Sequence, residues 1–340
     1  MNILIQSITG DASTDEVLDW LHYLAPEGKI TRLDNEVPIG KFSYRIYKME
    51  ETLELQTETG DPIRLNTLHS RWYRRGALRI NIPQLRSSTD GAHRLAMTAY
   101  NYLSMEYNYL NNTLDFLLAQ NTKSINRYED NATNKLKNLS MAAKAGLTVP
   151  DTLITNDIDE LELFVSEHTQ VITKAISYSD FVTRMPGHSV HIGLDPTLIE
   201  EADLIELKNT VDTGTTLPAL YQQYIEKRYE LRIFYLDGSF YPMAIFSQAS
   251  EKTKVDFRNY DEQRPNRCIP YNLPGTTEEQ LRSLMRQIDM NCGSIDMIVT
   301  PSGDYVFLEV NPVGQFQWLS HNCNYGLERL IAQELCSMNS

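Results

Sequence analysis

The sequence predicts an α/β fold of α+β character in three pieces. Three patterns support this: an opening strand and helix, hairpins of alternating apolar residues, and helices with clear periodicity. Residues 2–7 form an apolar run typical of a buried first strand. Ser13 and Glu16 have the spacing of a capping box, in which each side chain satisfies an amide at the start of a helix. Val17 and Leu21 follow at helical spacing, so the chain opens strand–loop–helix.

Hairpins and helices alternate through the rest of the chain. Residues 42–66 alternate in polarity around a turn at 59–62, and Asp237-Gly238 is the turn of a second hairpin. Further strands and helices follow from apolar periodicity and from Gly and Pro at their ends; strands are expected at 169–176 and 217–225, and helices at 91–120, 131–146, 277–289 and 324–337. We divide the chain into domains 1–115, 116–220 and 221–340.

The composition predicts a soluble cytoplasmic enzyme. The chain has 340 residues, of which 41% are hydrophobic and 22% charged, and its formal net charge is −14. This negative charge repels phosphates, so we expect no nucleic-acid partner and no anionic membrane partner. The sequence contains no apolar run long enough for a membrane span, no signal peptide and no C-x-x-C pair among its four cysteines.

Two carboxylates and an amide are expected to converge on a hairpin within residues 293–311. A two-residue turn at 302–303 would place Asp296 opposite Glu309, with Asn311 on the same face as Glu309. Like charges directly opposite one another destabilise a sheet, so a cation is expected between them. Carboxylate and amide oxygens suit Mg²⁺. The alternative is a pair of acidic residues on a solvated edge.

The segment 307–316, Phe-Leu-Glu-Val-Asn-Pro-Val-Gly-Gln-Phe, together with Asp296, resembles the metal-binding end of ATP-grasp ligases that mature ribosomal peptides, the graspetide or microviridin-type ligases. Residues 13–20 and 71–75 are similar to segments of the grasp-with-spasm subgroup of these peptide maturases. The resemblance covers essentially the whole chain. It implies an ATP-grasp fold, in which an N-terminal α/β domain precedes two α+β domains that clasp ATP.

The resemblance also implies which residues bind ATP and Mg²⁺. Asp296, Glu309 and Asn311 would hold the metal. Four groups of residues are expected at the nucleotide. The lysines at the phosphates are Lys135 and Lys174, and the hinge beside adenine is Gln222, Gln223, Tyr224 and Ile225. Glu230 is expected at the ribose, and Arg232 and Arg258 at the transferred phosphate. Arginine suits a phosphate because its planar fork donates two hydrogen bonds.

Other interpretations of these segments stay open at the sequence level. The lysines could be solvated cations and the hinge a plain strand, although the apolar strand around Lys174 favours a buried anionic partner. The stretch 176–193, where related enzymes carry a glycine-rich loop, has only two glycines, and His188 and His191 within it are interpreted as surface residues. Arg71, Arg74 and Arg75 fit either a groove for an anion or peptide or an internal ion-pair network.

By resemblance, the expected activity is ADP-forming ligation within a ribosomal precursor peptide that has a leader and a core. A carboxylate is activated as an acyl phosphate, and a hydroxyl or amine of the same peptide attacks it to give an ω-ester or ω-amide macrocycle. Related enzymes indicate a homodimer. Two alternatives remain: a ligase for a small molecule or a protein terminus, like glutamate ligases, and a non-catalytic nucleotide- or peptide-binding module.

Overall fold

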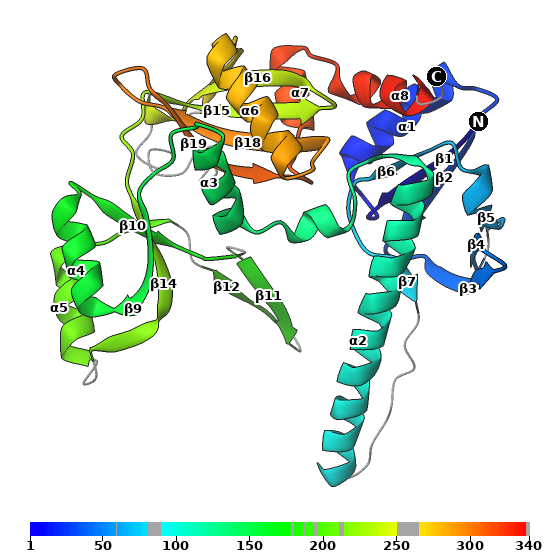
Figure 1. The fold of residues 1–340 in the computed structure, drawn as a ribbon, viewed down its shortest axis with the longest axis horizontal. Helices are drawn as coiled ribbons and strands as arrows, with labels where there is room; N and C mark the ends of the chain where they lie inside the picture. The colour runs from blue at the N-terminus through cyan, green and yellow to red at the C-terminus, as the bar shows by residue number, and fades with distance from the viewer. Residues whose placement is uncertain are drawn as a thin grey trace. The chain divides into compact units, whose positions relative to one another are not determined.

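The computed structural model describes residues 1–58, 60–80, 90–177, 180–185, 188–193, 196–210, 214–249 and 265–337. The chain forms two compact units (Figure 1). The first comprises Met1–Thr133, Met290–Gly293 and Asn311–Ser340, and the second comprises Asn134–Asp289 and Ser294–Val310. The domain boundaries at 115 and 220 stay a prediction. Within the described residues, no helix combines the length and the apolar character needed to cross a membrane.

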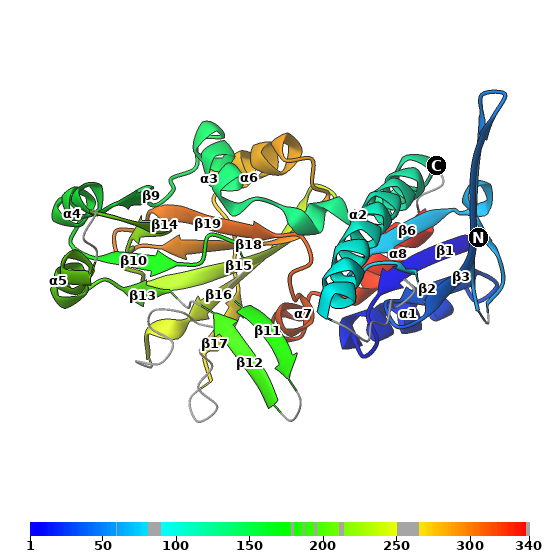
Figure 2. The ribbon, with the colours of Figure 1, turned by 90° about the horizontal axis from the view of Figure 1, so that it is seen from below.

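A parallel sheet forms the centre of the first unit. Its strand order is β2-β1-β6-β8, with bounds Lys29–Asp34, Asn2–Ser7, Ser70–Tyr73 and Lys123–Ile125. Helices α1 (Ala12–Leu24) and α8 (Leu327–Ser337) cover one face, and α2 (Asp90–Asn121) covers the other (Figures 1 and 2). The apolar run of β1 is buried on both faces, as parallel strands between helix layers require. The predicted opening strand and helix are confirmed.

A second sheet of the first unit has the order β5-β4-β3-β7, with bounds Ile63–Arg64, Glu50–Thr57, Pro38–Tyr47 and Arg79–Ile80. β3 and β4 form the expected hairpin, but they turn at Lys48 and Met49, whose φ angles are 49° and 69°. The turn expected at 59–62 includes residue 59, which lies outside the described residues, and residues 60–62 precede the short β5, which pairs with β4. Apolar side chains of β4 share a core with the C-terminal half of α2, including Leu53, Leu55 and Leu114.

The capping box expected at Ser13 is wrong, because α1 begins earlier. Asp11 is the N-cap, and its Oδ1 accepts hydrogen bonds from the amides of Ser13 (3.0 Å) and Thr14 (3.3 Å). An aspartate is a strong cap because its charge also interacts favourably with the helix dipole. Glu16 is therefore not used in capping and lies in α1 just after the first turn, in which Asp15 is the acidic residue.

The N-terminal part of the second unit contains a four-stranded sheet with two helices on one face. The sheet order is β13-β10-β14-β9, with bounds Thr197–Leu198, Val171–Lys174, Thr215–Gln223 and Thr152–Asp157. Helices α4 (Ile158–Glu167) and α5 (Glu201–Thr210) pack on one face (Figure 1). Leu161, Val171 and Tyr221 form the buried centre of that contact. Strands β11 (Asp180–Met185) and β12 (His188–Gly193) form a separate antiparallel pair.

A five-stranded sheet completes the second unit and carries the residues of most interest. Its order is β17-β16-β15-β18-β19, with bounds Arg267–Pro270, Ser239–Phe246, Tyr229–Leu236, Cys292–Val299 and Tyr305–Asn311. The predicted turn at Asp237-Gly238 is confirmed, with φ angles of 40° and 93° that suit a tight hairpin. Helices α3 (Lys135–Lys144) and α6 (Gly275–Gln287) lie against each other beside this sheet (Figure 2).

Candidate active site

The carboxylates Asp296 and Glu309 come from neighbouring strands, β18 and β19, and line one cavity of the second unit. The turn between these strands differs from the prediction. The Thr300 amide donates to the Asp304 carbonyl (3.0 Å), and the Gly303 amide donates to the Thr300 carbonyl (3.0 Å). The turn thus has three residues, 301–303, and Gly303 takes the left-handed conformation with φ of 96°. The register beside the turn is therefore shifted by one residue, while the convergence of the two carboxylates is retained.

Each of these carboxylates is paired with a cation of the same unit. Arg232 Nη1 donates to both oxygens of Asp296, at 2.8 and 2.6 Å. Lys135 Nζ lies 2.9 Å from Oε2 of Glu309. The Arg232–Asp296 pair is largely buried, whereas the Lys135–Glu309 pair is partly exposed. Two cation–carboxylate pairs therefore lie at this part of the second unit, and a metal bound by the carboxylates would compete with the two cations.

The hinge segment Gln222–Ile225 lines the same cavity at the end of β14. Gln222 bridges two strands: its Oε1 accepts from Lys174 Nζ (2.8 Å), and its Nε2 donates to the hydroxyl of Thr152 (2.9 Å). The amide of Tyr224 is bonded to the carbonyl of Gln170 at 2.9 Å. These bonds fix the Lys174 ammonium and the hinge backbone beside the same space.

Lys227 and Glu230 form a buried ion pair, and both residues line the cavity. Burial raises the pKa of Glu230 to about 7, against a smaller lowering by Lys227. The Oε2 atom of Glu230 is buried and makes no hydrogen bond within the described residues. Sequence analysis missed Lys227; the only available signal was its position three residues before Glu230, at the entry to a buried strand.

Arg232 and Asn311 are not among the residues that line this cavity, although Arg232 contacts Asp296, which does. Asn311 ends β19, two residues beyond Glu309, and its Oδ1 accepts from the amide of Val313 (3.2 Å). Arg258 lies outside the described residues. The side chains of His188 and His191 on β12 also lie outside the described set, so their interpretation stays a prediction.

The three arginines of the first unit pair with internal carboxylates, which favours the ion-pair network among the two interpretations of this motif. Arg71 is fully buried and paired with Asp115. Arg74 is buried, lies 3.3 Å from Asp11, and donates to the carbonyl of Val313 (2.7 Å). Burial lowers the pKa of Arg74 to about 10. Arg75 also faces Asp11, at 3.5 Å, and is only partly exposed.

Comparison with solved structures gives matches over the whole chain, whereas no protein-family model and no curated protein matches the sequence. A Chryseobacterium gregarium RiPP-associated ATP-grasp ligase, solved with ADP and a leader and core peptide, is 26% identical, with a TM-score of 0.77 and coverage of 100% of this chain and 97% of that chain. The Microcystis aeruginosa macrocyclase MdnC, bound to its precursor peptide MdnA, is 25% identical, with a TM-score of 0.74 and 99% coverage of both chains. The ATP-grasp ligase PsnB, solved with a minimal precursor, Mg and ADP, is 14% identical with a TM-score of 0.70, covers 99% of this chain and 97% of that chain, and is similar in fold.

Proposed function

We propose that this chain, which is an ATP-grasp ligase, joins side chains within a ribosomal precursor peptide to form ω-ester or ω-amide rings. A peptide carboxylate oxygen attacks the terminal phosphorus of ATP, the bond to the bridging oxygen breaks, and ADP leaves. A hydroxyl or amine of the same peptide then attacks the acyl carbon and releases phosphate. The observation that carries this proposal is the cavity where Asp296 and Glu309 meet Lys174 and the hinge. The grasp-with-spasm subgroup remains part of the proposal.

The donor set on β18 and β19 fits Mg²⁺. Asp296 and Glu309 offer carboxylate oxygens at one cavity, and Asn311 ends the same strand as Glu309 with an amide oxygen. Such oxygens, with positions left for phosphate, are the ligands that Mg²⁺ prefers. An ion held by these residues would supply positive charge to neutralise the phosphates. Arg232 is held at Asp296 by two contacts and would orient that carboxylate while its remaining donors face the phosphates.

The nucleotide side of the cavity fits ATP. Glu230 has a buried carboxylate oxygen without a hydrogen bond in the described chain, which suits a ribose hydroxyl as donor. Lys135 and Lys174 offer cations for the phosphates, and Gln222, Gln223, Tyr224 and Ile225 form the wall where an adenine edge would pair with backbone. Arg258 is proposed as a second phosphate arginine on the resemblance alone.

The test is a single reaction with intact-mass analysis. The full chain is incubated with Mg·ATP and with a Thr- and Glu-rich precursor peptide that carries a leader and a core. The expected result is a peptide lighter by one water for each bond, with one ADP formed for each water lost. The variant Glu309→Gln serves as the inactive control. An unchanged peptide with ADP still produced would point to a small-molecule or protein-terminus acceptor, and formation of AMP would contradict acyl-phosphate chemistry.

We also propose that a second copy of this chain covers part of α2, giving a homodimer, and that nucleic acid is not a partner. The N-terminal half of α2 extends beyond the sheet it packs on (Figure 1). It exposes apolar and aromatic side chains, among them Leu95, Tyr102 and Met105. Exposed apolar patches of this kind are typical of interfaces. Light scattering of the full chain should give twice the monomer mass, and Tyr102→Ser with Met105→Ser should give a monomer.

A further inference from the structure

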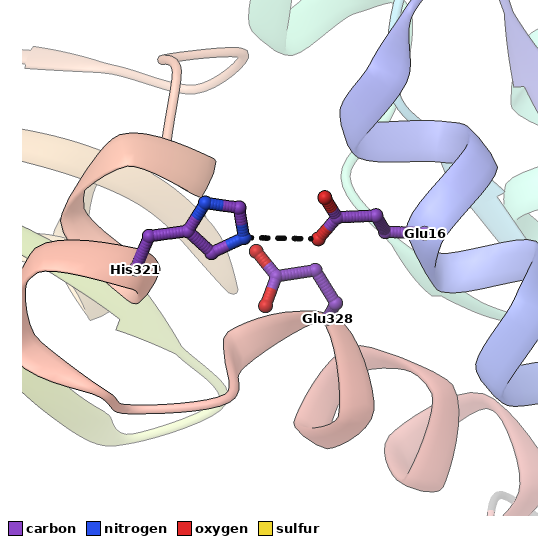
Figure 3. A group of neighbouring side chains, drawn as sticks. All are labelled: Glu16, His321 and Glu328. Atoms are coloured by element: carbon purple, nitrogen blue, oxygen red, sulfur yellow. Dashed lines mark hydrogen bonds and ion pairs between the residues drawn. The ribbon is translucent and has the colours of Figure 1, made fainter.

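Three side chains of the first unit, none of them assigned to the candidate active site, converge at one point. Glu16 comes from α1, His321 from α7 (Gln317–Cys323) and Glu328 from α8 (Figure 3). One candidate ligand atom from each lies within 4.8 Å of the other two. Neither the proposed ligase chemistry nor the α1 cap uses any of them, although Glu16 belongs to the N-terminal motif of the sequence.

Local structure aims the three groups at one another. The left-handed residue Asn324, with φ of 55°, ends α7 and allows the chain to reverse into α8. This reversal brings His321 and Glu328 together. On the other side, the Glu16 carboxylate is oriented by a hydrogen bond from Gln317 Nε2, and its second oxygen lies 3.2 Å from His321 Nε2.

Glu328 supplies an independent sign of a missing partner. The residue is only 4% exposed, and the hydroxyl of Ser320 donates to its Oε2 at 2.7 Å. Its Oε1 is buried and makes no hydrogen bond to any described residue. Figure 3 shows one oxygen of this carboxylate pointing into the gap between the imidazole and Glu16. A buried carboxylate oxygen without a donor is costly, and a cation would remove that cost.

We propose that Glu16, His321 and Glu328 form a binding site for Zn²⁺ that ties α1, α7 and α8 together. Tetrahedral zinc with ligand bonds of about 2.1 Å separates neighbouring ligand atoms by about 3.4 Å, so the His321–Glu16 contact already has the required spacing. One imidazole nitrogen with two carboxylates favours zinc over Mg²⁺, which prefers oxygen ligands alone. His321 is exposed, so the metal has a route from solvent and a fourth position for water.

Isothermal titration with Zn²⁺ alone as the probe tests this site. The full chain is stripped with a chelator and titrated in a large excess of Mg²⁺, so that the oxygen-rich active site is already occupied. The wild type should bind one equivalent that His321→Ala and Glu16→Gln lose. Loss of a residue that merely orients a metal ligand lowers metal affinity by about 10–100-fold. Loss of either ligand should lower the affinity for Zn²⁺ by more than that. His22→Ala is the matched control, because His22 is an exposed histidine on the same helix as Glu16.

A second readout separates metal binding from a folding defect. Zn²⁺ should raise the melting temperature of wild type and of His22→Ala, and leave that of His321→Ala unchanged. Co²⁺ in place of Zn²⁺ should give the intense visible bands of a tetrahedral site in the wild type. His321→Ala and Glu16→Gln should not show these bands. Equal binding by all four proteins, or no binding by wild type, would overturn the proposal. Because neither readout depends on ATP turnover, the result is independent of the proposed ligase activity.

Discussion

Lys135 Nζ and Glu309 Oε2, 2.9 Å apart, pair the lysine proposed for phosphate with a carboxylate proposed for metal. Each group therefore has to give up the other when a metal–nucleotide complex binds. The pair is partly exposed, with 38% and 23% of the two side chains accessible, so its attraction is modest. Because of this coupling, removing the lysine should strengthen the binding of the metal and weaken the binding of the nucleotide.

Lys135→Met should tighten Mg²⁺ binding measured without nucleotide and weaken ATP binding. An exposed ion pair is worth up to about 1 kcal/mol, so Mg²⁺ affinity should rise by about fivefold at most. Calorimetric titration of each ligand separately provides the measurement. Lys137→Met, an exposed lysine two residues along α3, should change neither affinity. Weaker Mg²⁺ binding in Lys135→Met would contradict the exchange.

Asp296→Asn and Glu309→Gln should each abolish Mg²⁺-dependent ADP formation, because each removes a charged oxygen ligand while keeping the side-chain shape. The loss should exceed about 100-fold, since even residues that only orient metal ligands cost about 10–100-fold. Asp304→Asn, an exposed carboxylate on the same hairpin, is the control and should retain activity. Steady-state ADP release is the measurement.

Arg232→Lys should lower kcat for ADP formation by about 100-fold while changing the KM for ATP far less. The substitution keeps the charge but loses the nitrogen that contacts both Asp296 oxygens, and electrostatic stabilisation of a transition state depends on such placement. Arg228→Lys changes an exposed arginine four residues earlier and should be neutral. A large change in KM with normal kcat would assign Arg232 to ground-state binding instead.

Glu230→Gln should alter how stability depends on pH. The folded pKa of about 7 lies above the ordinary value of 4.5, so protonation of Glu230 contributes its full stability below about pH 4.5, and this contribution is lost as pH rises through 7. Between pH 5 and 8 the wild type should lose about 2 kcal/mol more unfolding free energy than Glu230→Gln. Urea unfolding followed by circular dichroism at the two pH values measures this; parallel losses would show that Glu230 ionises normally.

Arg71→Met should destabilise the first unit by about 3–5 kcal/mol, because it leaves Asp115 as an unpaired carboxylate that is only 5% exposed. Arg64→Met breaks an exposed pair with Glu54 and should cost less than about 1 kcal/mol. Trp72 is buried next to Arg71, so urea unfolding followed by tryptophan fluorescence compares the two variants directly. Similar effects of both would contradict the structural role assigned to Arg71.

The sequence was sufficient for most of the elements, because these depend on apolar periodicity. Runs such as Glu309-Val310-Asn311-Pro312 carried a resemblance to ATP-grasp peptide ligases, and solved structures of such ligases are similar to this chain over its whole length. The homodimer, the cytoplasmic location and the individual site residues stay predictions. The hairpin register was wrong by one residue because Pro301 favours the first position of a longer turn and Gly303 its left-handed end.

Other errors share a cause that a single sequence cannot remove. Asp11, rather than Ser13, caps α1, and only the fold shows that its other oxygen faces Arg74 at 3.3 Å. Lys227 was missed because burial of a lysine depends on a partner and on the surrounding layers, neither of which is encoded in spacing. The internal roles of Arg71 and Arg74 could not be predicted for the same reason, because their partners Asp115 and Asp11 are brought to them only by the fold.

The split of the first unit across the sequence determines the order in which the protein can mature on a ribosome. Helix α8 packs against α1, and the hydroxyl of Ser70 on β6 donates to the carbonyl of Leu335 (2.8 Å). The second unit, whose residues all precede 311, is therefore synthesised in full while α1 and β6 still await their cover. Nascent chains that carry only residues 1–133 would display apolar surface to chaperones, and the first half of the gene expressed alone should be prone to aggregation.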